Sequence, residues 1–162
     1  MSREAGRAYD LDVVFTAVKF IHILLAIVAV GFNASYAIWL RRAARSREHE
    51  AFALRGVKFL DDRIANPAYG LLLLTGLTMV FLSGLRLTTF WIAGALVLWL
   101  IAMAIGIGLF TPTLRRQIAA LEASGAQSEE YRALDQRARI YGITTGVVVL
   151  LILALMVFKP GA

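Results

Sequence analysis

The chain alternates long apolar runs with polar segments, and the first apolar run is the clearest. From Phe20 to Leu40 no residue carries a formal charge, and the run lies between Lys19 and the pair Arg41–Arg42. A run of this length is enough to cross a bilayer as one helix. Three similar runs follow, so the pattern predicts transmembrane helices at about 13–40, 67–85, 90–110 and 141–158.

The length of these runs also decides the fold class. In lipid every backbone amide needs a partner, and an uninterrupted apolar run finds its partners within a helix. Barrel strands would give short alternating segments instead. A composition of 59% hydrophobic and 17% charged residues agrees with a membrane protein. The sequence therefore predicts one all-α membrane domain, residues 1–162, with four transmembrane helices in an antiparallel bundle.

Two polar segments flank the first run. Residues 1–12 are expected to form a short tail that is frayed as far as Leu11. The connection 41–65 has apolar residues at helical spacing, with Ser46 as an N-cap candidate. We therefore expect a helix there that lies on the membrane surface or against the end of the bundle.

Helix boundaries are expected at prolines and at capping residues. Asn66 followed by Pro67 predicts the start of the second membrane helix, and the residues 83–89 predict a tight turn into the third. Pro112 is expected to loosen the third helix at the membrane boundary. The third helix is expected to end at Gly125, a C-terminal cap, and the fourth helix is expected to start at Ser128. The third and fourth helices are therefore expected to extend beyond the bilayer, as far as these caps, as an antiparallel hairpin.

Lysine and arginine are distributed unevenly between the two sides of the membrane. The segments 41–65 and 111–140 hold seven and five of them, and the rest of the chain holds five. The positive-inside rule then places both segments in the cytoplasm as helical extensions and both termini outside. We expect a multi-pass protein of the bacterial plasma (inner) membrane. Its basic residues suit anionic lipid heads rather than nucleic acid, and a homo-oligomer or a membrane protein partner is a further expectation.

Two short patterns recur along the chain. Leu40–Arg42 and Leu114–Arg116 close the first and third helices, while Tyr69–Gly70 and Tyr141–Gly142 open the second and fourth. This spacing is consistent with two parallel copies of a two-helix unit. The alternative is that helices leaving a membrane commonly end in arginine, without any duplication.

His22 is the one histidine within an apolar run. One interpretation is a pocket in which His22 supplies an imidazole to a haem iron or metal, Asn33 a hydrogen bond and Lys19 a charge for a propionate. The alternative is that Lys19 reaches the headgroups and His22 bonds a neighbouring helix. One stripe of the first helix joins these residues and is expected to face the bundle: Lys19, His22, Ala26, Ala29, Asn33 and Ala37.

Small and acidic residues in the chain are expected to have structural roles. Gly142 with Gly146, Ala102 with Gly106, and Gly70 with Gly76 are expected to let helices approach closely. The cluster formed by residues 61–63, Asp-Asp-Arg, is interpreted as a solvated loop, with pairing to Arg41 or Arg42 as the alternative.

Several enzyme classes lack their residues here. The chain has no cysteine, no phosphate-binding loop and no serine–histidine–acid set. No aspartate or glutamate lies within an apolar run, which argues against a proton-coupled transporter. The sequence thus favours a protein without a catalytic site.

The segment 19–24, KFIHIL, and the Leu74–Leu77 segment, LTGL, carry a family resemblance. With the Asp-Arg pair before a proline-started second helix, they resemble an uncharacterised family of predicted bacterial integral membrane proteins. That family is distantly similar to HemJ-type protoporphyrinogen oxidases and to the copper resistance D membrane domain. The resemblance implies haem b on the first-helix histidine, here His22. The lysine that the HemJ-type proteins have in the third helix has no counterpart in 90–110, so the resemblance does not extend to the oxidase activity.

Three functions remain open at this point. The first is a non-enzymatic accessory or assembly protein of the membrane. The second is a haem b-binding redox protein that uses His22, and the third is permeation of a metal or small solute. Lack of intramembrane acids weakens the third.

Overall fold

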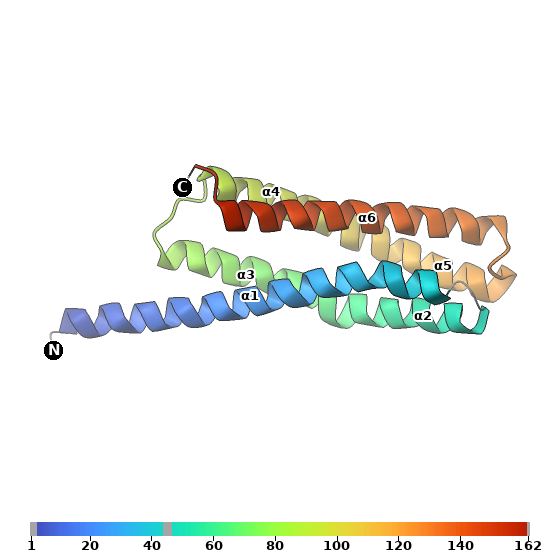
Figure 1. The fold of residues 1–162 in the computed structure, drawn as a ribbon, viewed down its shortest axis with the longest axis horizontal. Helices are drawn as coiled ribbons and strands as arrows, with labels where there is room; N and C mark the ends of the chain where they lie inside the picture. Colours follow the sequence, from blue (N-terminus) through green and yellow to red (C-terminus); the bar gives the residue numbers. More distant parts are fainter. Residues whose placement is uncertain (1–2, 44–46, 162) are drawn as a thin grey trace.

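The computed structural model describes residues 3–43 and 47–161, and within these ranges it is helical apart from short turns. Four long helical rods run antiparallel to one another (Figure 1). Each contains a helix long and apolar enough to cross a membrane, which confirms the all-α membrane fold. The elements are α1 (Arg3–Ala43), α2 (Arg47–Leu60), η1 (Asp61–Ala65), α3 (Asn66–Leu82), α4 (Phe90–Ile105), η2 (Gly106–Phe110), α5 (Thr111–Ser124) and α6 (Glu129–Phe158).

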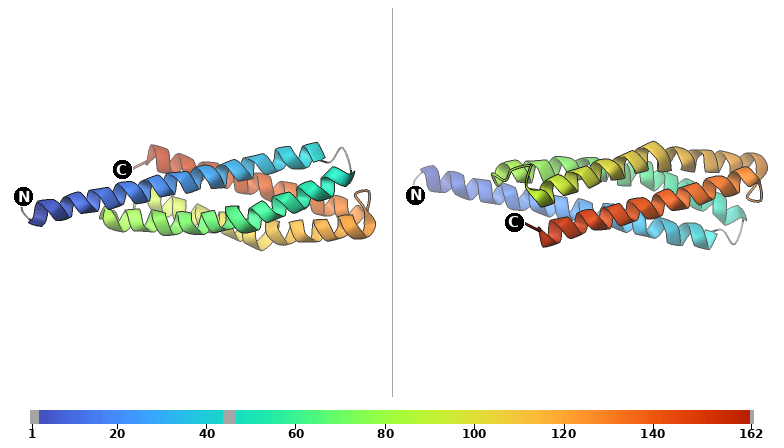
Figure 2. Two further views of the ribbon diagram at one scale, coloured as in Figure 1. Left: turned by 90° about the horizontal axis from the view of Figure 1, so that it is seen from below. Right: turned by 90° about the horizontal axis from the view of Figure 1, so that it is seen from above.

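The rods form two hairpins that pack as two layers. Helix α1 packs along α3, and α4 packs along α6, as the views from both sides also indicate (Figures 1 and 2). At the opposite end from the termini, α2 contacts α1 and α5, and α5 contacts α6. The expected antiparallel extension of the third and fourth helices is therefore present, and the first hairpin extends alongside it.

Both prolines expected to mark helix boundaries lie just after a widened, π-helical turn. In η1 the N–H of Asn66 donates to the carbonyl of Asp61, five residues earlier. In η2 the N–H of Thr111 donates to the carbonyl of Gly106. A proline has no N–H, and its ring clashes with the carbonyl four residues back, so a widened turn accommodates it within a continuous helix.

This arrangement confirms one proline prediction and corrects another. Pro112 does loosen its helix locally, as expected. The second rod, however, does not start at Asn66–Pro67, because α2 continues through η1 into α3. Of the two placements expected for a helix in 41–65, the membrane surface is wrong and the end of the bundle is confirmed. Helix α2 packs on α1 and α5 there, and its Leu54 and Val57 are buried in the core.

The turns at the two ends follow the expected capping chemistry. The Ser128 hydroxyl accepts the N–H of Tyr131 at 3.2 Å, and Gly125 ends α5 with a φ of 78°, where glycine is favoured. A turn joins α3 and α4 at 83–89, as predicted. At the N-terminus the prediction of fraying to Leu11 is wrong, because α1 already begins at Arg3. The proposed cap Ser46 lies outside the described residues.

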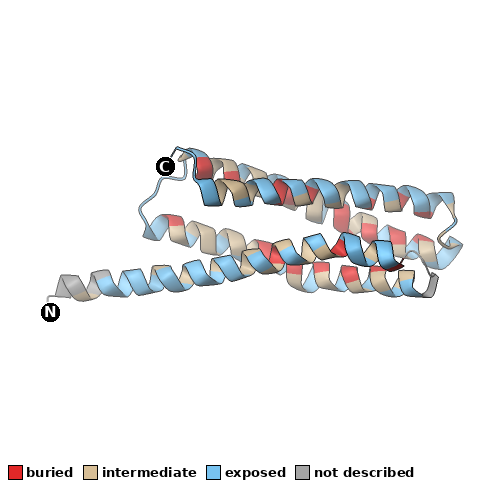
Figure 3. Cartoon of the chain, in the orientation of Figure 1, coloured by how far each residue is buried: buried red, intermediate tan, exposed pale blue. Residues whose placement is uncertain are grey.

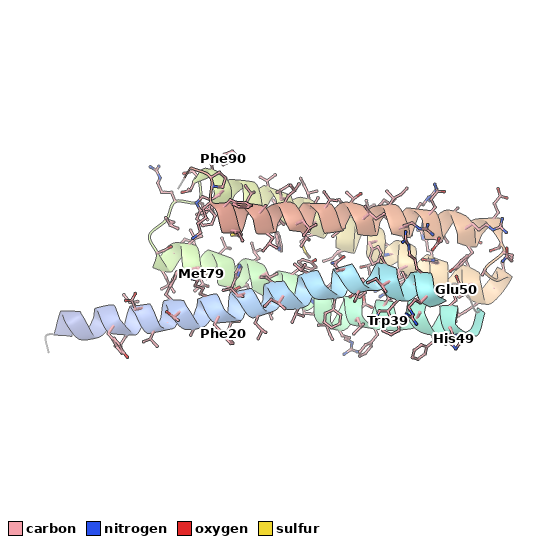
Figure 4. The ribbon with its side chains drawn as sticks, viewed as in Figure 1. Phe20, Trp39, His49, Glu50, Met79 and Phe90 are labelled. Carbon is pink, nitrogen blue, oxygen red and sulfur yellow. The ribbon has the colours of Figure 1, made fainter. Side chains whose placement is uncertain are left out.

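The end of the bundle that contains α2 and α5 has its own core. Leu54 and Leu114 are almost completely buried there, at 1% and 0% exposure. The Tyr131 hydroxyl of α6 donates to Glu50 of α2. Burial raises the pKa of Tyr131, and the hydrogen bond to Glu50 raises it further, so this tyrosine stays protonated and keeps donating. Figure 4 labels Glu50 at this end of the molecule.

The glycine pairs do not mark close helix contacts. Among the described residues, a Cβ added to Gly70, Gly106 or Gly146 would meet nothing within 4 Å. Gly142 would make only ordinary contact, 3.7 Å, with Phe110. The prediction of close packing is therefore wrong at Gly70, Gly106, Gly142 and Gly146, whereas Gly76 does have a close neighbour, described below.

Candidate functional site

The His22 side chain of α1 lies in a notch on α3. Its Nδ1 atom is 2.8 Å from the Thr75 hydroxyl. A Cβ added to Gly76 would come within 3.2 Å of the imidazole Cε1, so the ring fits against α3 because residue 76 is glycine. The Thr-Gly pair of the segment LTGL thus positions the histidine of the segment KFIHIL.

The Thr75 hydroxyl lies within hydrogen-bond distance of three groups. They are the Leu71 carbonyl at 2.7 Å, the Leu72 carbonyl at 3.2 Å and His22 Nδ1 at 2.8 Å. When its one hydrogen is donated to a carbonyl, its oxygen accepts from His22, and Nδ1 is the protonated nitrogen. Nε2 is then left with a free lone pair, the arrangement in which a histidine can bind a metal.

The other two residues of the expected pocket lie elsewhere. Asn33 donates from Nδ2 to the Tyr69 hydroxyl at 2.7 Å, and it is eleven residues, or about 16 Å, along the helix from His22. Lys19 is exposed. The structure therefore does not bring Lys19, His22 and Asn33 together around one cavity, and the haem pocket stays a prediction.

The buried line of α1 also differs from the expected stripe. Four members of the stripe, His22, Ala26, Ala29 and Asn33, are buried or half-buried as predicted, but Lys19 and Ala37 are exposed. Residues seven apart are covered instead, since Ala29, Tyr36 and Ala43 are buried. A seven-residue spacing keeps one face of a helix against a neighbour that it crosses at a small angle. The predicted stripe assumed 100° per residue along a straight helix, so it departs from this face at both of its ends.

A second polar group lies where all four rods meet, near the two π-helical turns. Asp61 is only 6% exposed. The Thr111 hydroxyl donates to its Oδ2 atom at 2.8 Å, and Asn66 Nδ2 lies 3.4 Å from the same oxygen. The interpretation of Asp61 as part of a solvated loop is therefore wrong, although its neighbour Asp62 is exposed and pairs with Lys58.

A small cavity adjoins this carboxylate. Its volume of about 20 Å³ is enough for one water-sized species. The Thr145 hydroxyl, which lines it, is buried and has no hydrogen-bond partner among the described residues. The lining residues are Asn33, Asp61, Asn66, Tyr69, Ala102, Met103, Gly106, Phe110, Gly142 and Thr145.

Sequence reasoning missed this group because it treated residues 61–63 as a solvated loop and placed the start of the second membrane helix at Asn66–Pro67. A signal was present: Asp61, Ala65 and Tyr69 are four residues apart, and they form one buried stripe if the helix is continuous. Reading Pro67 as a helix start removed that continuity. Figure 3 shows buried positions on all four rods in this part of the bundle.

These features define a class of protein, an integral membrane protein with four helices that can cross a bilayer. Residues 16–160 match the family described as "Predicted integral membrane protein (DUF2269)". The chain belongs to this family, whose description names no activity. No curated protein and no solved structure matches the chain.

Proposed function

We propose that this protein is a non-enzymatic accessory or assembly protein of the bacterial inner membrane. The observation that carries the proposal is the N-terminal part of α1, which runs past the ends of the other helices (Figures 1 and 2). Helix α1 has 41 residues and is therefore about 60 Å long. Its apolar side chains in this part, Leu11, Val13 and Val14, are 51%, 50% and 48% exposed.

Because this part of α1 runs past the other helices, its apolar side chains are left for lipid or for a helix of another protein. A membrane protein partner would cover them by van der Waals packing between helices. The polar side chains within the first hairpin, by contrast, bond to one another, as His22 does to Thr75 and Asn33 to Tyr69. Their arrangement supports a structural role better than a catalytic one.

Site-specific photo-crosslinking in native membranes tests this proposal. A photoreactive residue at position 11 or 14 should give a covalent adduct with a different protein. The matched control is Leu150, an equally exposed apolar residue (58%) on the bundle itself, which should give no such adduct. Adducts at all three positions, at none, or only with a second copy of this chain would contradict an accessory role.

The orientation belongs to the same proposal. The two termini and the turn at 83–89 lie at one end of the bundle, and the turn between α5 and α6 lies at the other (Figure 1). With the basic segments 41–65 and 111–140 in the cytoplasm, reporter fusions after Ala65 and near Gly125 should behave as cytoplasmic. Fusions at 83–89 and at the C-terminus should behave as external, and a cytoplasmic C-terminus would overturn the charge argument.

A second candidate, haem b binding, is favoured by one observation. His22 Nδ1 lies 2.8 Å from the Thr75 hydroxyl, and with the proton on Nδ1 the Nε2 lone pair would be available as an axial ligand. Of the expected pocket only this donor fits, because Asn33 bonds Tyr69 and Lys19 is exposed. When bound, haem would supply one-electron chemistry at this position.

Absorption spectroscopy decides this candidate. Protein produced with ample haem should show a Soret band, and His22→Ala should abolish it while the fold is retained. Thr75→Val, which keeps the imidazole but removes its anchor, should alter the band rather than abolish it. A colourless wild-type protein would eliminate the haem function.

A further inference from the structure

Asp61 is a buried carboxylate that forms no salt bridge within the described residues. Lys58, one turn earlier on the same rod, is bonded to Asp62. The groups that contact the Asp61 carboxylate, the Thr111 hydroxyl and the Asn66 amide, are both neutral. An ionised carboxylate in such a place is costly unless a positive charge compensates it.

A proton or a cation can supply the compensation. Burial raises the pKa of Asp61 and favours its protonated form, and the hydrogen bond from Thr111 opposes this only in part. The Thr111 hydroxyl and Asn66 Nδ2 both donate to the Oδ2 atom, so the site can hold the ionised form when a cation lies beside it.

The side chains around the adjoining cavity offer oxygen atoms. Asn33 uses its Nδ2 on Tyr69, so its Oδ1 remains an acceptor. In Asn66 the Nδ2 likewise points at Asp61, which leaves its Oδ1. The Thr145 hydroxyl is 6% exposed and has no partner among the described residues. With Asp61 itself, these residues place three neutral oxygens and one charged oxygen-bearing group around the cavity.

The two π-helical turns contribute to the same cavity. Asp61 comes from η1, while Gly106 and Phe110 come from η2. Irregular helix turns of this kind are frequent at functional sites.

We propose that this cavity binds one monovalent cation of the size of Na⁺, which neutralises the Asp61 carboxylate. A cavity of about 20 Å³ admits one ion without its water shell. Magnesium usually retains several waters, and calcium takes six to eight oxygen ligands that commonly include several carboxylates. The described residues contain no group of three or more acidic, histidine or cysteine side chains that could hold a metal ion.

Thermal unfolding of the purified full-length protein tests the cation site. NaCl is varied against choline chloride at constant ionic strength, and the Tm is measured by a fluorescence or light-scattering readout. Ligand binding to the folded state raises the Tm with ligand concentration, so the Tm should rise with Na⁺ and reach a plateau. Asp61→Asn should abolish the dependence on Na⁺. Asp62→Asn, the same change of charge at the exposed neighbour, should retain it.

A second variant keeps the test decisive if Asp61→Asn does not fold. Thr145→Val removes one neutral oxygen and should raise the Na⁺ concentration at the midpoint of the Tm rise by about fivefold, the ratio expected for one weakened contact. Three results would overturn the proposal. They are a Tm independent of Na⁺, an equal Na⁺ effect with and without the Asp61 carboxylate, and an unchanged midpoint in Thr145→Val.

Discussion

The two helix hairpins meet their own partners in different ways. Between α1 and α3 the contacts include polar pairs, His22 with Thr75 and Asn33 with Tyr69. Between α4 and α6 the described contacts are apolar, with Gly94 against Leu155. The Thr145 hydroxyl of α6 has no partner across that interface.

This difference shows where the chain specifies its helix register. An apolar interface in lipid gains only from close packing, and neighbouring registers pack almost equally well. A donor that reaches an acceptor on the facing helix allows one register, because a shifted helix would leave both groups unpaired. We infer that these polar pairs fix the register of α1 against α3, whereas the third rod and α6 have their polar pair farther along, where Gln117 of α5 donates to Asp135 of α6.

The largest effect on this contrast is expected at Tyr69, which is buried where the two hairpins meet. Tyr69→Ala should lower the free energy of unfolding by about 3–5 kcal/mol, because a large ring leaves the core. Tyr69→Phe retains the ring and loses only the bond from Asn33, so it should cost about 1 kcal/mol. SDS titration in mixed micelles measures both. If Tyr69→Phe were as stable as the wild type, the polar pair would contribute nothing.

A matched pair of glycines sharpens the contrast at the next level. A Cβ at Gly76 would lie 3.2 Å from the His22 ring, and one at Gly94 would lie 3.2 Å from a terminal methyl of Leu155. The ring is anchored by Thr75, whereas the methyl can rotate away. Gly76→Ala should therefore be less stable than Gly94→Ala by about 1–3 kcal/mol.

The double variant controls the glycine experiment. Because His22→Ala removes the ring that the new methyl would meet, it should relieve most of the cost of Gly76→Ala. In the Gly94→Ala background, His22→Ala should lower the stability by the same amount as it does in the wild type. Equal costs at the two glycines would mean that both interfaces tolerate repacking.

The smallest effect is expected where α2 of one hairpin meets α5 of the other. Arg55 and Glu122 form a salt bridge there, but their side chains are 63% and 51% exposed. Glu122→Gln should cost about 0.2–1 kcal/mol, and added salt should remove the difference. A larger, salt-resistant loss would show that this exposed pair contributes as much as the buried polar contacts do.

Much of this fold follows from local sequence patterns. Four apolar runs predict four rods, and Gly125 and Ser128 cap helices as their chemistry requires. These features depend on neighbouring residues in the chain, so a single sequence contains them. Pro112 was also interpreted correctly, because a proline in an apolar helix disturbs its own turn wherever it lies.

The errors arise where a local rule depends on a contact between distant segments. Pro67 does not begin a helix, because η1 widens the turn before it and carries the helix through. Asp61 is buried because Thr111, fifty residues later, donates to it. The segments KFIHIL and LTGL stand out in the sequence. The spacing of apolar residues does not indicate, however, that Thr75 of the second segment bonds His22 of the first. Residue spacing within one helix does not determine which helix lies opposite.

The central claim is that the bond between His22 and Thr75 couples α1 to α3. A double-mutant cycle of His22→Ala and Thr75→Val, with SDS unfolding as the readout, measures that coupling directly. We expect about 0.6–1.7 kcal/mol, the range for side-chain hydrogen bonds between membrane helices. Thr78 is the control, because it is exposed and bonds only its own helix, at the Leu74 carbonyl. His22→Ala with Thr78→Val should show no coupling beyond about 0.3 kcal/mol, and an equally small value for Thr75 would contradict the claim.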